Sequence, residues 1–257
     1  MNEVYKLFDI SCKVALITGA TGGFGKAASI GLAKAGAKIM LTGRTATKLE
    51  PVIRAIREDG GVAEQCAGSP VSPGDVQAVV RATVQAFGGI DILVTAAGMN
   101  KPKPIIEQPL EDWKEVMDVN VTGTWLFCKE AGKVMIEQKR GGKVILISST
   151  RGMLGMANYA AYAPSKAAIN LMTKSLGCEW GPHGIQVNAI APTVFRTELT
   201  QWMFDDQAAY KNFLRRIPLG RLGEPEDFVG TLIFLASRAS DFMTGSIVYV
   251  DGGYTAG

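Results

Sequence analysis

Short apolar runs alternate along the chain with longer segments in which apolar positions recur every three or four residues. The short runs predict β-strands and the longer segments predict amphipathic helices. The predicted strands lie at residues 14–18, 38–43, 62–68, 90–96, 143–149, 185–191 and 246–252. The predicted helices lie at residues 24–35, 46–58, 73–87, 111–138, 163–180 and 225–237. This alternation predicts a doubly wound α/β fold, with a parallel sheet and helices on both of its faces.

Neither a repeat nor a break in composition divides the chain, so a single domain over residues 1–257 is expected. Residues 193–224 form a long insertion between a predicted strand and the last predicted helix. Connections of this length in compact domains often serve function, and we expect a lid over the substrate. Trp202 and its apolar neighbours would form the underside of this lid.

Composition and charge exclude several classes of function. The 257 residues are 47% hydrophobic with a net charge of +3, and no basic run indicates nucleic-acid binding. The apolar stretches are too short to cross a membrane, and the N-terminus lacks a signal-peptide pattern, so a cytoplasmic protein is expected. Four cysteines without C-x-x-C spacing and one histidine, His183, predict no metal site.

A glycine-rich turn, TGATGGFG at residues 18–25, follows the first predicted strand and leads into the first predicted helix. Glycine lets the backbone approach a pyrophosphate closely, and the helix N-terminus offers free N–H groups. The turn therefore predicts a nucleotide-binding site, although its spacing differs from G-x-G-x-x-G and such a turn also serves tight packing.

Tyr162 and Lys166 are four residues apart in a predicted helix, so their side chains share one face. A lysine cation beside a phenol favours the phenolate and would lower its pKa, which makes the tyrosine a candidate general acid/base. Ser149, thirteen residues before Tyr162, ends a predicted strand. A phosphate-binding turn together with a tyrosine acid/base predicts hydride-transfer chemistry.

These motifs occur in a familiar order: T-G-x-x-x-G-x-G, Asn120 in DVNVTG, Ser149 in ISSTRG, Tyr162-x-x-x-Lys166, then NAIAP and DGG. Over about residues 10–254 the chain resembles the short-chain dehydrogenase/reductase family. The segments EPEDFVGTLIFLAS and YVDGG are most similar to gluconate 5-dehydrogenases and β-ketoacyl reductases. The resemblance implies a Rossmann-type fold with a seven-stranded parallel sheet, a nicotinamide cofactor and a homotetramer or homodimer.

The resemblance also implies the roles of individual residues. Tyr162 would exchange a proton with the substrate oxygen, and Ser149 would hydrogen-bond the same oxygen. Lys166 would lower the tyrosine pKa and hold the nicotinamide ribose, while Asn120 would hold a water that connects Lys166 to solvent. The residues expected to bind the cofactor are Gly19, Thr21, Gly23, Phe24, Gly25, Arg44, Ala97, Gly98, Tyr162, Lys166, Pro192, Val194 and Thr197.

The end of the second predicted strand bears on cofactor choice. NAD-specific enzymes place a carboxylate there to bind the adenine-ribose hydroxyls. Gly43 occupies this position here and Arg44 follows, and a guanidinium suits a 2′-phosphate. We therefore expect NADP(H) to be favoured over NAD(H); the alternative is a solvated Arg44 with use of both cofactors.

Three motifs depart from the family pattern. The usual N-N-A-G is Thr95-Ala96-Ala97-Gly98, Pro70 replaces an aspartate beside the adenine, and Thr193 replaces the glycine after Pro192. None of these changes removes a proton-transfer group, so the reaction class is unaffected.

The substrate is expected to contact Arg151, Asn158 and Trp202, with Lys101, Lys103 and Arg196 as further nearby cations. Such a cleft suits a small polar secondary alcohol or ketone, such as a sugar acid or polyol. A β-ketoacyl thioester reductase is the alternative enzyme. A non-catalytic nucleotide-sensing protein is disfavoured, because Tyr162 and Lys166 are both present.

Overall fold

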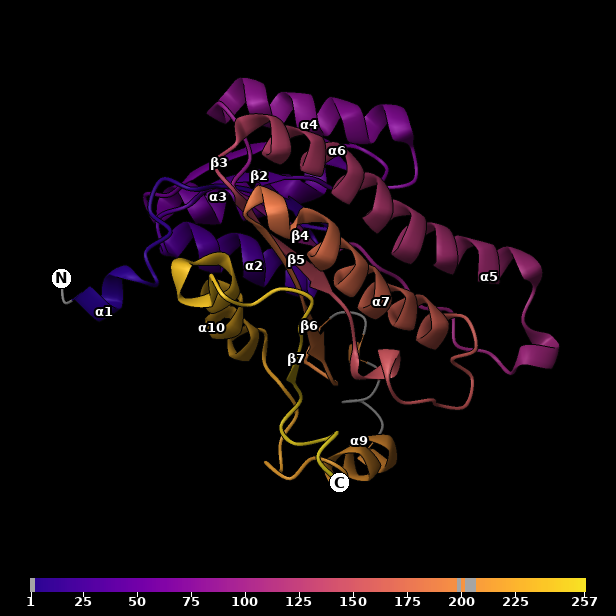
Figure 1. Ribbon diagram of the computed structural model, residues 1–257. Coiled ribbons are helices and arrows are strands. Elements are labelled where there is room, and N and C mark those ends of the chain that lie inside the picture. Colours follow the sequence, from indigo (N-terminus) through magenta and orange to yellow (C-terminus); the bar gives the residue numbers. More distant parts are fainter. Residues whose placement is uncertain (1–2, 198–199, 202–206) are drawn as a thin grey trace.

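The computed structural model describes residues 3–197, 200–201 and 207–257. Within these ranges one sheet contains seven strands, all parallel, in the order β3-β2-β1-β4-β5-β6-β7 (Figure 1). The strands are β1 Val14–Thr18, β2 Lys38–Leu41, β3 Val62–Gln65, β4 Ile92–Thr95, β5 Gly142–Ile147, β6 Ile185–Pro192 and β7 Ile247–Val250. Each lies within or overlaps a predicted strand, so the predicted doubly wound parallel sheet is confirmed.

Helices cover both faces of the sheet (Figure 1). On one face lie α2 Gly23–Lys34, α3 Ala46–Glu58 and α10 Pro225–Ala236. On the other lie α4 Pro73–Phe87, α6 Gly123–Gln138 and α7 Tyr162–Trp180. The remaining helical elements are α1 Glu3–Lys6, η1 Ile105–Glu107, α5 Leu110–Met117, η2 Asp118–Thr122, η3 Thr150–Gly152, η4 Gly181–His183, α9 Gln207–Leu214 and η6 Arg238–Ser240.

Alternate residues of each central strand enter two separate cores. In β1, Ala15 and Ile17 pack toward α2 and α10, whereas Leu16 packs toward α4 and α6. All five residues of β1 and all four of β4 are buried. The continuous apolar runs in the sequence therefore reflect strands buried on both faces.

The strand order reverses at β1, which pairs with β2 on one side and with β4 on the other. At this point the connections leave toward opposite faces, so the loops that follow β1 and β4 separate. A crevice forms at the carboxyl ends of the strands, where ligands bind in open α/β sheets.

The helix expected at residues 111–138 is interrupted. A π-helical turn, η2, separates α5 from α6 and contains the buried Asn120. Such turns are rare and occur frequently at functional sites. The insertion at residues 193–224 also differs from an irregular loop, because it contains α9.

None of the helices in the described ranges combines the length and apolarity needed to span a lipid bilayer.

The contact between α6 and α7 depends on the absence of a side chain at Gly132. A Cβ at this position would lie 2.7 Å from two ring carbons of Trp180, which is only 6% exposed. We expect Gly132→Ala to lower the stability by about 1–2 kcal/mol, roughly 2–6 °C in melting temperature, because overpacking outweighs the gain in helix propensity.

Gly230→Ala is the matched control for this prediction. Gly230 is an exposed residue of α10, and a Cβ there would meet no atom within 4 Å. This variant should be as stable as the parent or more so by up to about 1 kcal/mol. Equal melting temperatures for the two variants would contradict the packing argument.

Candidate active site

The turn after β1 packs against the loop after β4. Gly19 has φ +61°, and a Cβ there would lie 2.6 Å from the backbone of Ala97. The N–H of Ala97 donates a hydrogen bond to Thr18 Oγ1 at 3.1 Å. The two loops are therefore held at a separation that only glycine permits at position 19.

The N-terminus of α2 follows this turn. Its N-cap residue is Gly22, and no side chain caps the helix, so the N–H groups of the first turn remain available. A cavity of about 580 Å³ extends beside the turn. Among the expected cofactor residues, Gly19, Thr21, Arg44, Ala97 and Gly98 line this cavity. These features fit the pyrophosphate and adenosine portions of a dinucleotide.

The other residues of the turn contribute differently. A Cβ at Gly25 would overlap the carbonyl oxygen of Gly19, and a Cβ at Gly23 would overlap the side chain of Thr197. Phe24 packs its ring against Phe195 and Phe228, with centroids 5.1 and 5.2 Å away. The partly buried Phe24 ring thus packs against the core.

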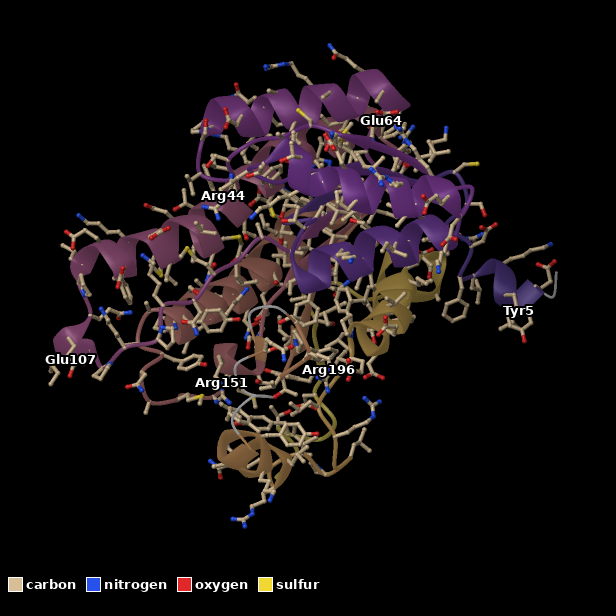
Figure 2. All side chains as sticks on the ribbon, turned by 180° about the vertical axis from the view of Figure 1, so that it is seen from behind. Tyr5, Arg44, Glu64, Glu107, Arg151 and Arg196 are labelled. Atoms are coloured by element: carbon tan, nitrogen blue, oxygen red, sulfur yellow. The ribbon has the colours of Figure 1, made fainter. Side chains whose placement is uncertain are left out.

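Arg44 lies at the end of β2, at the edge of this cavity, with its side chain exposed (Figure 2). Gly43 precedes it in the same lining, and Pro70 lies there as well. Among the described residues, no ion pair or hydrogen bond engages the Arg44 guanidinium. Its charge is therefore available to an anionic group in the cavity.

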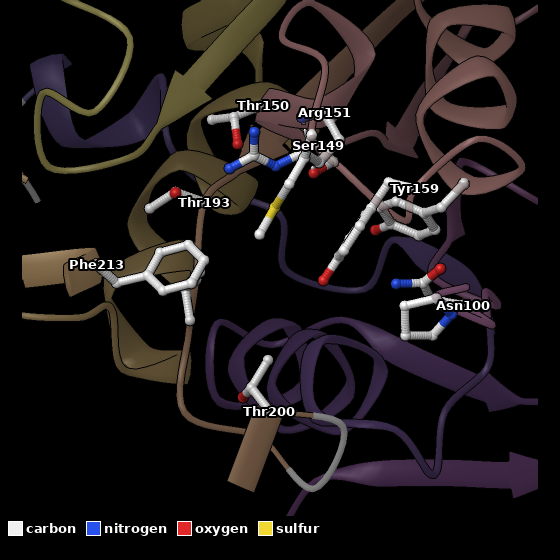
Figure 3. Close-up of a pocket in the computed structure, with 12 residues that line it drawn as sticks. Asn100, Ser149, Thr150, Arg151, Tyr159, Thr193, Thr200 and Phe213 are labelled. Carbon is white, nitrogen blue, oxygen red and sulfur yellow. Dashed lines mark hydrogen bonds between the residues drawn. The ribbon is translucent and has the colours of Figure 1, made fainter. Parts of the chain in front are cut away.

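A second cavity, of about 340 Å³, is lined by residues that follow β4, β5 and β6 (Figure 3). It contains Ser149 and Tyr162, which bring the end of β5 and the start of α7 together. The remaining lining residues are Asn100, Pro102, Thr150, Arg151, Met156, Tyr159, Thr193, Val194, Thr200 and Phe213.

Tyr162, Ser149 and Lys166 form one group. Tyr162 is the first residue of α7, and a hydrogen bond from the Ser149 side chain engages its phenol. Lys166 lies one turn later, and its Nζ is 5.6 Å from the centroid of the Tyr162 ring. Lys166 is buried, and its Nζ donates a hydrogen bond to the carbonyl oxygen of Ile147 at 2.8 Å.

The predicted lowering of the tyrosine pKa by Lys166 is wrong for the protein in this form. Burial raises the pKa of Tyr162 to about 12, while the Ser149 hydrogen bond and the charge of Arg151 oppose this shift. Burial also lowers the pKa of Lys166 to about 8. The lysine ammonium hydrogen-bonds Ile147 rather than the phenol, so desolvation dominates at both groups.

Asn120 connects three elements around this group. Its Oδ1 accepts from the N–H of Met99 at 2.8 Å, and its Nδ2 donates to the Met99 carbonyl at 3.0 Å and to Ser165 Oγ at 2.9 Å. A Cβ at Gly98 would lie 3.4 Å from Asn120 Oδ1 and 3.6 Å from Lys166 Nζ. The structure therefore brings Asn120, Gly98 and Lys166 together, with the Asn120 side chain occupied by protein partners.

The remaining expected residues are Pro192, Val194 and Thr197 for the cofactor and Asn158 and Trp202 for the substrate. Val194 lines the second cavity, and Pro192 ends the preceding strand β6. Thr197 contacts Gly23 and accepts or donates a hydrogen bond with Thr200 at 3.0 Å. Asn158 is exposed and is not among the lining residues, while Trp202 lies outside the described residues.

Three of the cations expected near the substrate are paired with carboxylates or lie outside the lining of the second cavity. Lys101 forms ion pairs with Asp112 and Glu115. Arg196 forms an ion pair with Glu224. Neither these two nor Lys103 belongs to the described lining of the second cavity, whereas Arg151 does.

Several lining residues escaped sequence reasoning. Tyr159 lies three residues before Tyr162, with the two ring centroids 5.9 Å apart. The short spacing of the two tyrosines in the sequence could have identified Tyr159 as a site residue. Asn100 follows Gly98 by two residues and hydrogen-bonds Tyr159 through its side chain. Phe213 comes from α9, so no local pattern connects it with the site.

Comparison with known proteins agrees with this arrangement. A family model described as enoyl-(acyl carrier protein) reductase matches residues 19–255. An uncharacterized oxidoreductase of Mycobacterium tuberculosis is 48% identical over 254 residues, covering 97% of this chain and 93% of that protein.

Two crystal structures superimpose closely on the fold. A short-chain type dehydrogenase/reductase from Mycobacterium marinum has a TM-score of 0.95 and 37% identity, covering 99% of this chain and 100% of that one. A gluconate 5-dehydrogenase from Burkholderia cenocepacia, in complex with NADP and tartrate, also has a TM-score of 0.95, with 34% identity and coverage of 99% and 100%. From its fold, its site geometry and these similarities, the chain belongs to the short-chain dehydrogenase/reductase family.

Proposed function

We propose that this protein is an NADP(H)-dependent oxidoreductase that interconverts a secondary alcohol and a ketone in a small polar substrate. The observation that carries the proposal is the position of the Tyr162 phenol. It lies in a cavity of substrate size, engaged by Ser149 and one helical turn from Lys166. A phenol in this position can exchange a proton with an oxygen in the cavity.

Side chains of the protein would transfer the proton and orient the substrate and the cofactor. During reduction, the Tyr162 O–H donates its proton to the oxygen of the developing alkoxide; during oxidation, the phenolate takes the hydroxyl proton. The Ser149 hydroxyl would donate a hydrogen bond to the same oxygen. When bound, the nicotinamide accepts or supplies the hydride at its C4 position. Lys166, held by the Ile147 carbonyl, would present its remaining donors to the ribose.

The raised pKa of Tyr162 favours one direction of the reaction at neutral pH. At neutral pH the phenol is protonated and is ready to act as the acid of ketone reduction. Alcohol oxidation requires the phenolate, which alkaline pH favours.

NADP(H) is the proposed cofactor because Arg44 is exposed beside the first cavity with no described partner and no acidic neighbour precedes it at Gly43. A guanidinium binds a phosphate through two parallel hydrogen bonds. The Burkholderia relative, which was crystallised with NADP, agrees with this preference.

The proposed substrate is a small sugar acid or polyol. Its support is a pair of polar side chains in the wall of the second cavity, because Asn100 Oδ1 and Thr193 Oγ1 are buried without hydrogen-bond partners among the described residues. The name of the gluconate 5-dehydrogenase relative points to the same class. A β-ketoacyl thioester reductase is the second candidate, favoured by the name of a relative from Synechocystis, a 3-oxoacyl-(acyl-carrier-protein) reductase that is 35% identical over 246 residues.

The insertion at residues 193–224 is proposed as a lid. Thr200 and Phe213 from this segment line the second cavity, so the segment borders the substrate. A homodimer or homotetramer is proposed as well, because Trp125 of α6 and Leu171 of α7 are 47% and 66% exposed. Light scattering of the purified protein measures that state directly.

The function is tested by following nicotinamide absorbance with sugar acids, polyols, small ketones and acetoacetyl thioesters, each with both cofactors. For Tyr162→Phe we expect turnover to fall by at least about 100-fold while NADPH binding changes less than about threefold, because only the proton-transfer group is lost. Tyr159→Phe removes a neighbouring phenol of the same cavity and should retain turnover within about tenfold. Comparable losses in the two variants would contradict the role of Tyr162.

The pH dependence tests the electrostatics of the phenol. Oxidation should accelerate from neutral to alkaline pH, and reduction should slow over the same interval, because the two directions use opposite protonation states. In Ser149→Ala, the loss of a hydrogen bond that lowers the Tyr162 pKa should move the midpoint of both profiles toward higher pH. Profiles with an unchanged midpoint would rule out this contact as a determinant of the pKa.

Cofactor preference is tested by reversing the charge at Arg44. Arg44→Asp should lower kcat/KM with NADP(H) by roughly 10- to 100-fold and shift the preference toward NAD(H), because the phosphate loses its charged donor and meets a carboxylate. Arg54→Asp makes the same change at an exposed position outside the first cavity and should leave the cofactor ratio unchanged. The same ratio in parent and Arg44→Asp would refute the assignment.

A further inference from the structure

Arg151 is a buried cation in the wall of the second cavity. It lies in η3, two residues after Ser149, and only 7% of its surface is exposed. Figure 3 shows its side chain beside Ser149, with its guanidinium on the side of the cavity toward Thr193 and Phe213. Its charge influences the phenols of both Tyr159 and Tyr162, which places it near the reacting position.

The guanidinium is held in place by neutral groups. Nη2 donates to the phenolic oxygen of Tyr254 at 2.5 Å, and Nη1 donates to the carbonyl oxygen of Gly155 at 3.2 Å. The guanidinium carbon also lies 5.2 Å from the centroid of the Tyr254 ring. A guanidinium has five donors, so these contacts orient Arg151 and leave donors for a ligand.

Tyr254 is itself firmly positioned. It is 2% exposed and packs with Ile217 and Leu222 in a small apolar cluster. The turn that carries it is closed by Asp251, whose carboxylate accepts from Gly253 N–H and from the N–H and Oγ1 of Thr255. The C-terminal segment therefore acts as a support for the Arg151 side chain.

Among the described residues, no carboxylate balances Arg151. Its described contacts include no ion pair, and the described residues that line the cavity contain neither aspartate nor glutamate. A buried charge without a counter-ion is unfavourable unless an anionic ligand supplies one. A cation held rigidly in the wall of a cavity is typical of a site for a planar anion, which a guanidinium binds through two hydrogen bonds.

We propose that Arg151 determines substrate specificity by binding a carboxylate of the substrate, with Tyr254 as its positioning residue. This inference rests on the proposed function, and it selects polyhydroxylated acids over neutral polyols. With the carboxylate at Arg151 and the reacting carbon at Tyr162, the unpartnered Asn100 Oδ1 and Thr193 Oγ1 would accept hydrogen bonds from hydroxyl groups between them.

The test compares an acid and a polyol of equal chain length, D-gluconate and D-glucitol, in the cofactor-bound enzyme. The parent should favour the acid. In Arg151→Gln we expect the KM for gluconate to rise about 100-fold with kcat within about threefold, and the KM for glucitol to change less than twofold. Arg151→Lys, which retains a charge, should recover part of the loss. Arg215→Gln, at an exposed position of the 193–224 segment outside the cavity lining, is the charge-matched control and should change the kinetics of neither substrate.

Tyr254→Phe keeps the supporting ring and removes only the hydroxyl that accepts from Arg151. It should raise the KM for gluconate by about five- to tenfold without affecting glucitol, because the guanidinium loses orientation but not charge. This variant keeps the test decisive if Arg151→Gln fails to fold, which thermal melting detects. Equal losses for the acid and the polyol would indicate a structural role and overturn the proposal, as would a parent enzyme that prefers glucitol.

Equilibrium binding separates this proposal from the proposed function. Calorimetric titration of the NADP-loaded protein with tartrate should show binding in the parent and at least a tenfold weaker affinity in Arg151→Gln. If this loss occurs but no alcohol or ketone is turned over by the parent, the carboxylate site stands and the proposed reaction fails. If gluconate is oxidised equally well by parent and variant, the reaction stands and the carboxylate site is overturned.

Discussion

The hydrogen bonds of the Asn120 side chain are the constraint on which the rest of the site depends. They join the loop after β4, through both backbone groups of Met99, to Ser165 of α7. Asn120 can reach both because the chain widens into a π-helical turn there. Lys166 follows Ser165 directly, and Gly98 precedes Met99, so one amide sets the distance between the loop and α7. A buried amide is a stable link only while all its partners are present.

Burial sets the electrostatics of the same region. It raises the pKa of the Tyr162 phenol and lowers that of the Lys166 ammonium, so both groups are shifted toward their neutral forms. Ser149 and Arg151 counteract the shift at the phenol. In a cavity without a described carboxylate, each positive charge therefore acts over a longer range than it would in water. This environment suits a reaction in which negative charge develops on a substrate oxygen.

The architecture was accessible from sequence because local patterns specify it. The strands of a parallel sheet buried on both faces are continuous apolar runs, and β1 at Val14–Thr18 and α4 at Pro73–Phe87 have the bounds that these patterns predict. The four-residue spacing of Tyr162 and Lys166 likewise gave their proximity. In contrast, the interruption of the helix at Asn120 and the helix α9 lack a local signal. The π turn places Asn120 in contact with Met99 and Ser165, and both partners come from other segments of the chain.

The sequence by itself determined the order of strands and helices, the glycine turn and the family of the chain, since these depend on periodicity, spacing and backbone freedom over a few residues. Only the tertiary structure decided which of the expected cations line the second cavity. It pairs Lys101 and Arg196 with carboxylates elsewhere and supports Arg151 by Tyr254, which is 103 residues away. It also decided that desolvation, rather than the lysine charge, dominates at Tyr162. Partner choice and burial are properties of the packed chain, because each sums contributions from segments that meet only on folding.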